Sequence, residues 1–131
     1  MDEKIISILK MDARRTNVDI ARELGTSEGT VRARIKKLIS SGQIRKFTIK
    51  TKSRNITAFI DVKVDTNSLT RDISLAIKDI PGVESVYEIS GDYDIVVLVD
   101  VENTDRLNYI IDSIRKLGVE GTRTRMILVE H

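Results

Sequence analysis

The sequence predicts an α+β protein with an N-terminal winged-type helix-turn-helix and a C-terminal βαββαβ sandwich of the ferredoxin-like type. Apolar residues recur at helical spacing up to residue 42, whereas alternating strand patterns dominate after residue 57. The charge divides as well, because residues 1–54 carry 14 Lys/Arg and 6 Asp/Glu, and residues 55–131 carry 8 and 14. The 131 residues suit two small domains. We predict a helix-turn-helix domain at 1–49, a linker at 50–56 and the sandwich domain at 57–131.

Three helices account for the first domain. The first spans residues 2–11, and the second spans 17–24 and ends at Gly25, which suits the positive φ needed just past a helix. Ser27 is a good N-cap for the third helix, which Gly42 closes. A strand is predicted at 44–50. The apolar positions expected to pack together are Ile5, Ile6, Ile8 and Leu9, then Val18, Ala21 and Leu24, and finally Val31, Ile35, Leu38 and Ile39.

The second domain follows the order strand, helix, strand, strand, helix, strand. Its first strand alternates apolar residues with Asp61 and Lys63, so one face of this strand is expected to be exposed to solvent. Pro81-Gly82 ends the first helix and turns the chain. Two helices cover only one face of a four-stranded sheet, so we expect dimerisation through the other face. The expected strands lie at 58–64, 83–89, 94–101 and 122–130, with helices at 69–80 and 107–114.

The composition narrows the class of protein. Charges interrupt every apolar stretch, and Asp2, Glu3 and Lys4 stand where a signal peptide would need a basic region and an apolar core. Cysteine is absent, so there is no disulfide framework and no thiolate metal site. We therefore expect a soluble cytoplasmic protein without a membrane partner. The composition has 19 isoleucines, many charges and only one glutamine, a thermolabile residue. This composition is typical of a heat-loving source.

The helix that Ser27 starts and Gly42 closes is predicted to read DNA. In a helix-turn-helix the second helix of the motif enters the major groove, and the basic first half of the chain supplies charge for phosphate. Gly29 and Ala33 are small enough to let the backbone approach the groove. The alternative is an ordinary helical hairpin with a solvated basic face, and Phe47 is expected to pack rather than to stack on bases. The candidate DNA-binding residues are Ser27, Glu28, Thr30, Arg32, Arg34, Lys36 and Lys37.

The turn from Ser90 to Asp94 is the one cluster of polar residues in the second domain that suggests a binding site. Gly91 permits close backbone approach, and the carboxylates of Asp92 and Asp94 suit an ammonium group, so the turn could bind a zwitterion such as a free amino acid. The alternative is a plain β-turn made of turn-favouring residues. Thr122 and Thr124 are expected on one face at the start of the last strand.

Catalysis has little support in the sequence. The only histidine is His131, no cysteine nucleophile exists, and no Gly-rich loop is present to cradle phosphate. Asp92 and Asp94 are the one pair that could bind a metal, and no further ligand stands at a recognisable spacing. We expect no enzyme, no cofactor and no metal site.

The chain resembles the Lrp/AsnC family, the leucine-responsive or feast/famine transcription regulators. Three stretches carry the resemblance: residues 2–9, residues 17–47, and the pair formed by Gly91-Asp92-Tyr93-Asp94 and Val119-Glu120-Gly121-Thr122-Arg123-Thr124. The resemblance covers nearly all of the chain. Two features depart from the family pattern: the connection from Thr48 to Ala58 is several residues shorter than usual, and no longer tail follows the last strand.

The resemblance implies a regulator that binds double-stranded DNA and senses amino acids. It implies dimers formed through the C-terminal sheets, which often assemble into octamers, with a small effector bound between dimers. It also assigns the effector-binding role to Gly91, Asp92, Tyr93 and Asp94, with Thr122 and Thr124 approaching the same site. Some family members have no known effector.

Three hypotheses follow from the sequence. The leading one is a sequence-specific, amino-acid-responsive transcription regulator. The second is an architectural DNA-binding protein with no effector, which would treat residues 90–94 as a turn. The third is a small-molecule-binding subunit of an enzyme, whose basic half would dock on a protein. The acidic pair gives a slight lean towards an effector with an amino group.

Overall fold

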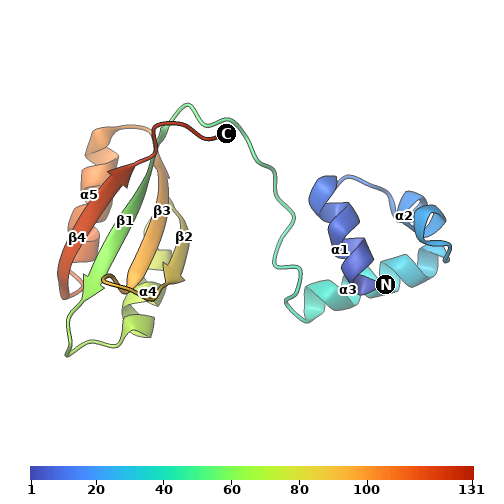
Figure 1. The fold of residues 1–131 in the computed structure, drawn as a ribbon, viewed down its shortest axis with the longest axis horizontal. Coiled ribbons are helices and arrows are strands. Elements are labelled where there is room, and N and C mark those ends of the chain that lie inside the picture. The colour runs from blue at the N-terminus through green and yellow to red at the C-terminus, as the bar shows by residue number, and fades with distance from the viewer. The chain divides into compact units, whose positions relative to one another are not determined.

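The chain folds into two compact units, Met1–Thr51 and Lys52–His131 (Figure 1). A computed structural model describes residues 1–131. The first unit contains α1 (Asp2–Met11), α2 (Asn17–Leu24) and α3 (Glu28–Ser40). The three helices share one apolar core, whose buried residues are Ile5, Ile20, Ala21, Val31 and Leu38. No helix in the structure combines the length and apolarity needed to cross a membrane.

The connection between α2 and α3 has the form expected of a helix-turn-helix. Thr16 Oγ1 accepts a hydrogen bond from the N–H of Asp19 and caps α2. Gly25 follows α2 with φ +66°, a left-handed conformation that glycine adopts without a Cβ penalty. Ser27 caps α3 through the N–H of Thr30. The predicted roles of Gly25 and Ser27 are therefore confirmed.

Two predicted core positions and one predicted strand are wrong. Val18 and Ile39 are about half exposed, and Ile20 is the residue of α2 that is fully buried beside Ala21. Residues 44–50 form no strand. An isolated extended segment has no neighbouring strand to satisfy its backbone groups, and of these residues only Ile44 donates its N–H, to the carbonyl of Leu38.

The second unit is an antiparallel sheet with two helices. It contains β1 (Ile56–Val64), α4 (Thr70–Lys78), β2 (Val83–Glu88), β3 (Ile95–Val101), α5 (Thr104–Arg115) and β4 (Val119–Met126). The strand order is β2-β3-β1-β4, and every neighbouring pair is antiparallel. This is the predicted βαββαβ order, with the nearly all-apolar strand β3 at the centre beside β1. The α+β fold class is confirmed.

Both helices pack on one face of the sheet (Figure 1). Their buried residues, among them Ile77 of α4 and Ile110 of α5, join alternate residues of β1 and β3 in a single core. Gly82 follows α4 with φ +97°, and a Cβ there would lie 2.9 Å from Ile110 Cδ1 and 3.0 Å from Val101 Cγ1. Only glycine fits this close approach between the turn and the helix layer.

The opposite face of the sheet carries no helix. Asp61 of β1 lies on this face and was expected to be wet, but it is 2 % exposed. The expectation is wrong because Arg123 and Arg125 of the neighbouring strand β4 cover its carboxylate. Alternation identifies the face on which a side chain lies, but it does not say what covers that face.

Candidate nucleic-acid interface and effector loop

The start of α3 is held by two residues that were predicted to contact DNA. Ser27 Oγ accepts a hydrogen bond from the N–H of Thr30 at 3.1 Å and lies 2.7 Å from Thr30 Oγ1. Both hydroxyl groups therefore have a structural role in the helix cap. Their second lone pairs stay at the surface, where phosphate or water can reach them.

The two arginines of α3 are tied to acidic residues. Arg32 forms a salt bridge with Glu28 one turn earlier, and this hydrogen bond raises the pKa of the arginine above its usual value. Arg34 Nη1 lies 3.3 Å from Asp2 Oδ1 of α1. Exposed pairs of this kind contribute little to stability, so either arginine can exchange its carboxylate for a phosphate.

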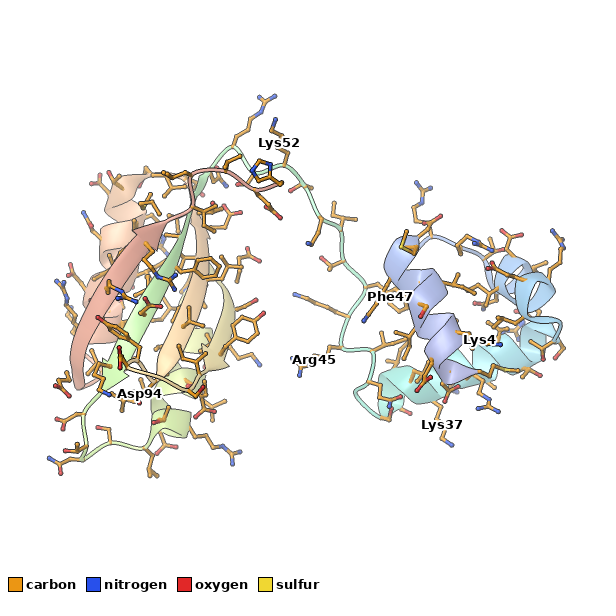
Figure 2. The ribbon with its side chains drawn as sticks, viewed as in Figure 1. Lys4, Lys37, Arg45, Phe47, Lys52 and Asp94 are labelled. Carbon is orange, nitrogen blue, oxygen red and sulfur yellow. The ribbon has the colours of Figure 1, made fainter.

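Lys36 and Lys37 are the free cations of the helix. Both are exposed, and neither has an acidic partner within 4 Å (Figure 2 labels Lys37). Gly29 and Ala33 are exposed on the same helix, and a Cβ at Gly29 would meet no atom within 4 Å. The exposed side of α3 thus combines small residues, which allow close approach, with cations that can neutralise phosphate.

The loop between β2 and β3 is anchored to β1. Asp94, labelled in Figure 2, has two partners on β1. Its Oδ2 accepts a hydrogen bond from the N–H of Val64 at 2.8 Å and lies 3.8 Å from Lys63 Nζ. The pairing of β1 with β4 shifts register between Lys63 and Val64, so the carboxylate binds at an irregularity of β1. Backbone bonds link Asp94 to Val62 and to Ile89 as well. Asp94 therefore has a structural partner in the single chain.

The other predicted effector residues divide between the two faces of the sheet. Tyr93 lies on the face without helices, where the guanidinium of Arg123 stands 4.5 Å from its ring centroid. Thr122 and Thr124 pair with Val62 and Ile60, whose side chains point to the helix side. The two threonines share a face, as predicted, but it is not the face of Tyr93. Gly91, with φ +114°, and Asp92 are exposed at the tip of the loop.

The sequence analysis missed the ion-pair cluster formed by Asp61, Arg123 and Arg125. Arg125 donates to both carboxylate oxygens of Asp61 at 2.8 Å, and Arg123 donates twice to Oδ2, at 3.0 and 2.8 Å. Burial by itself raises the pKa of Asp61, but the hydrogen bonds from Arg125 and Arg123 outweigh it and hold the pKa below its usual range. In the sequence, arginine alternates with threonine in β4, which indicates that the two arginines share one face of the strand. Only the register of β1 with β4 identifies Asp61 as the acidic partner of these arginines.

Each of the two units matches the model of a known protein family. Residues 1–39 match the model of the AsnC-type helix-turn-helix domain. Residues 57–131 match the model of the Lrp/AsnC ligand binding domain. Together the two matches cover nearly the whole chain.

Similar proteins are regulators of transcription. The chain is 46 % identical over 129 residues to the HTH-type transcriptional regulator LysM of Saccharolobus solfataricus, covering 97 % of this chain and 91 % of the relative. It is 38 % identical over 136 residues to the HTH-type transcriptional regulator FL11 of Pyrococcus furiosus, with 100 % and 89 % covered. Both organisms are thermophilic archaea, which agrees with the heat-loving source that the composition indicates.

One solved structure shares the fold of this chain over almost the whole length of both proteins. The feast or famine regulatory protein from M. tuberculosis, complexed with L-methionine, superposes with a TM-score of 0.85 at 26 % identity, covering 98 % of this chain and 90 % of the other.

Proposed function

The chain belongs to the Lrp/AsnC family of HTH-type transcriptional regulators, and we propose that its binding to specific DNA sequences responds to a small effector, such as an amino acid, held between dimers. Membership of the family makes it a DNA-binding transcription regulator. The sequence specificity, the effector and the assembly are the proposed parts.

The exposed side of α3 is the observation that best supports the proposed binding to specific DNA sequences. A helix capped by Ser27 presents two small residues and two unpaired lysines to solvent, and two arginines beside them are held only by exposed carboxylates. Arginine can read guanine through two parallel hydrogen bonds, whereas lysine mainly supplies charge for phosphate. This division predicts that Arg32 and Arg34 contribute specificity and that Lys36 and Lys37 contribute affinity.

The uncovered face of the sheet supports a dimer. Leu98 and Phe59 are partly exposed neighbours on β3 and β1, and Tyr87 of β2 is 55 % exposed. Apolar and aromatic side chains of this kind are enriched at protein interfaces. A symmetric dimer would place two α3 helices on half-sites about 10 bp apart or a multiple of that spacing.

An amino acid is the effector that the chemistry favours. Asp92 is exposed and has no ion-pair partner, while backbone groups of the loop around Gly91 lie at the surface. The related mycobacterial protein was solved as a complex with L-methionine. An effector at the 91–94 loop shifts assembly only if it binds the two assembly states with different affinity.

Selection of binding sites from a random duplex library tests the DNA proposal. We expect an enriched motif with two related half-sites. Arg32→Ala and Arg34→Ala should lose preference for that motif over random DNA, whereas Lys36→Gln with Lys37→Gln should weaken binding to both kinds of duplex. If both arginine variants bind like the wild type, α3 is not the reading helix.

Thermal unfolding with each of the twenty amino acids tests the effector. A ligand present at about 100 times its dissociation constant stabilises the protein by about 2.7 kcal/mol, a shift on the order of 10 °C for a domain of this size. No stabilisation by any amino acid would count against the effector.

One observation favours the architectural alternative. The carboxylate of Asp94, which was predicted to take an ammonium group, is already bound by the N–H of Val64. A loop built only to connect β2 with β3 would use Asp94 in this way. Such a protein would show a shallow sequence preference and binding governed by salt.

A further inference from the structure

The segment that joins the two units is strongly basic. Residues 45–54 contain no acidic residue and carry five cations, Arg45, Lys46, Lys50, Lys52 and Arg54. All ten residues are exposed, and none belongs to a helix or strand (Figure 2). We call residues 45–54 the basic arm.

The cations of the basic arm have no partner in the chain. The arginines of the helical part are mostly paired, as Arg15 is with Glu23 and Arg22 with Asp19. None of the five cations of the arm lies within 4 Å of a carboxylate. Their charge is therefore not used for folding.

Spacing separates the arm into a basic side and an apolar side. In an extended chain successive side chains point in opposite directions. Lys46, Lys50, Lys52 and Arg54 all stand at even positions, whereas the exposed apolar residues Phe47 and Ile49 stand at odd ones. An extended arm thus presents four of its five cations in one direction.

We propose that the basic arm is a second DNA-binding element, which binds phosphates of the duplex whose groove α3 reads. This proposal rests on the DNA-binding function and goes beyond it, because it assigns phosphate contacts to a segment outside the helix-turn-helix. DNA carries one negative charge per roughly 1.7 Å of its axis, so phosphates are in excess for cations spread along a fully extended arm of about 33 Å.

The arm begins at the reading helix itself. Ile44, the residue before it, donates its N–H to the carbonyl of Leu38 in α3 at 3.0 Å. This bond holds the start of the arm at the C-terminal end of α3, so an extended arm begins within reach of a duplex that α3 binds. The contacts are to phosphate, and they raise affinity for every sequence by about the same factor.

The salt dependence of binding tests the proposal. The variant Lys46→Gln, Lys50→Gln, Lys52→Gln, Arg54→Gln is compared with the wild type on one operator duplex and one random duplex. Each phosphate that a cation neutralises contributes about 0.9 to the slope of log Kobs against log salt. Full engagement of the four side chains makes the slope shallower by about 3.6 per bound chain on both duplexes.

Two control variants isolate the arm from net charge and from folding. Replacing Arg71, Lys78, Arg115 and Lys116 of the second unit by glutamine removes the same four charges, and the slope should stay at the wild-type value. Replacing Lys46, Lys50 and Lys52 by arginine keeps the charges, and the slope should again match the wild type. Thermal unfolding and sedimentation of the glutamine variant should equal those of the wild type.

The outcomes separate the proposal from the function on which it rests. A slope change below about 0.9 per chain, less than one phosphate contact, overturns the arm while DNA binding stands. A change in oligomeric state without a change in slope also overturns it and assigns the arm to assembly. Absence of wild-type DNA binding at low salt would instead contradict the function.

Discussion

At the residue scale, Asp61 links two strands through four hydrogen bonds. Its carboxylate is buried, while the side chains of Arg123 and Arg125 are about half exposed. The arginines therefore keep part of their hydration, and the carboxylate receives enough hydrogen bonds to offset its burial. Tyr93 and Phe59 flank the cluster through contacts with the two guanidinium groups.

We predict that Asp61→Asn lowers the free energy of unfolding by about 1–3 kcal/mol, because it leaves two arginines without a carboxylate. The folded pKa of Asp61 lies below its unfolded value of about 3.9, so the stabilisation is complete above that pH and is lost as the pH falls through the folded pKa. Urea unfolding should show a constant difference from pH 7 to about 5 and a shrinking one below pH 4. Asp79→Asn, which removes an exposed carboxylate, is the control.

Gly82 is a second residue on which the packing depends. We predict that Gly82→Ala lowers the free energy of unfolding by about 2–4 kcal/mol, since it combines left-handed strain with a clash against Ile110 and Val101. Gly118→Ala has a similar φ, +83°, but its Cβ would meet only Ser68 Oγ at 3.9 Å. Equal losses in chemical denaturation of the two variants would show that packing at Gly82 is unimportant.

At the scale of elements, most residues that stabilise α3 differ from those proposed to bind DNA. Val31 and Leu38 bury the inner side, Ser27 caps the start, and the exposed side keeps its cations. Glu28 belongs to both tasks, because an acidic residue stabilises a helix N-terminus but also holds Arg32.

We therefore predict that Glu28→Gln tightens DNA binding roughly two- to fivefold, about 0.4–1 kcal/mol, because it frees Arg32 and removes a charge that repels phosphate. The measurement is a titration of labelled operator at fixed salt. Glu3→Gln removes the same charge from α1 and should change affinity less than twofold. Weaker binding by Glu28→Gln would mean that this carboxylate contacts a base.

At the scale of the whole molecule, each unit leaves a surface that needs a partner. The helical unit has a basic side, which we propose binds DNA, and the sheet has a face without helices, which we propose pairs with a second copy. Leu98 lies on that face opposite Phe59, between the ion-pair cluster and the strand β2.

If the proposed dimer forms through this face, we predict that Leu98→Glu converts it into a monomer in analytical ultracentrifugation, because the substitution would bury a charge at the centre of the proposed interface. DNA affinity should fall as well, since a monomer binds one half-site. Leu75→Glu places the same charge on α4, where the residue is 51 % exposed, and should leave the dimer intact. A Leu98→Glu dimer of wild-type stability would place the interface elsewhere.

Much of the fold followed from local patterns in the sequence. The order of the elements, the left-handed Gly25, the cap at Ser27 and the apolar strand β3 all depend on residues within a few positions of one another. Local rules failed where the outcome depended on a distant neighbour. Residues 44–50 have a strand pattern but no strand beside them, and Ile39 lies at the edge of a helix stripe that the small core does not cover.

The candidate sites divide in the same way. The sequence alone determined that α3 is basic and capped, because charge and capping are properties of its own residues. Only the tertiary structure decided that Asp94 is bound by Val64, that Tyr93 and Thr122 lie on opposite faces, and that Asp61 is buried beneath Arg123 and Arg125. The contacts among them join residues 30 to 64 positions apart. The register of the strands, which no local pattern specifies, brings these residues together.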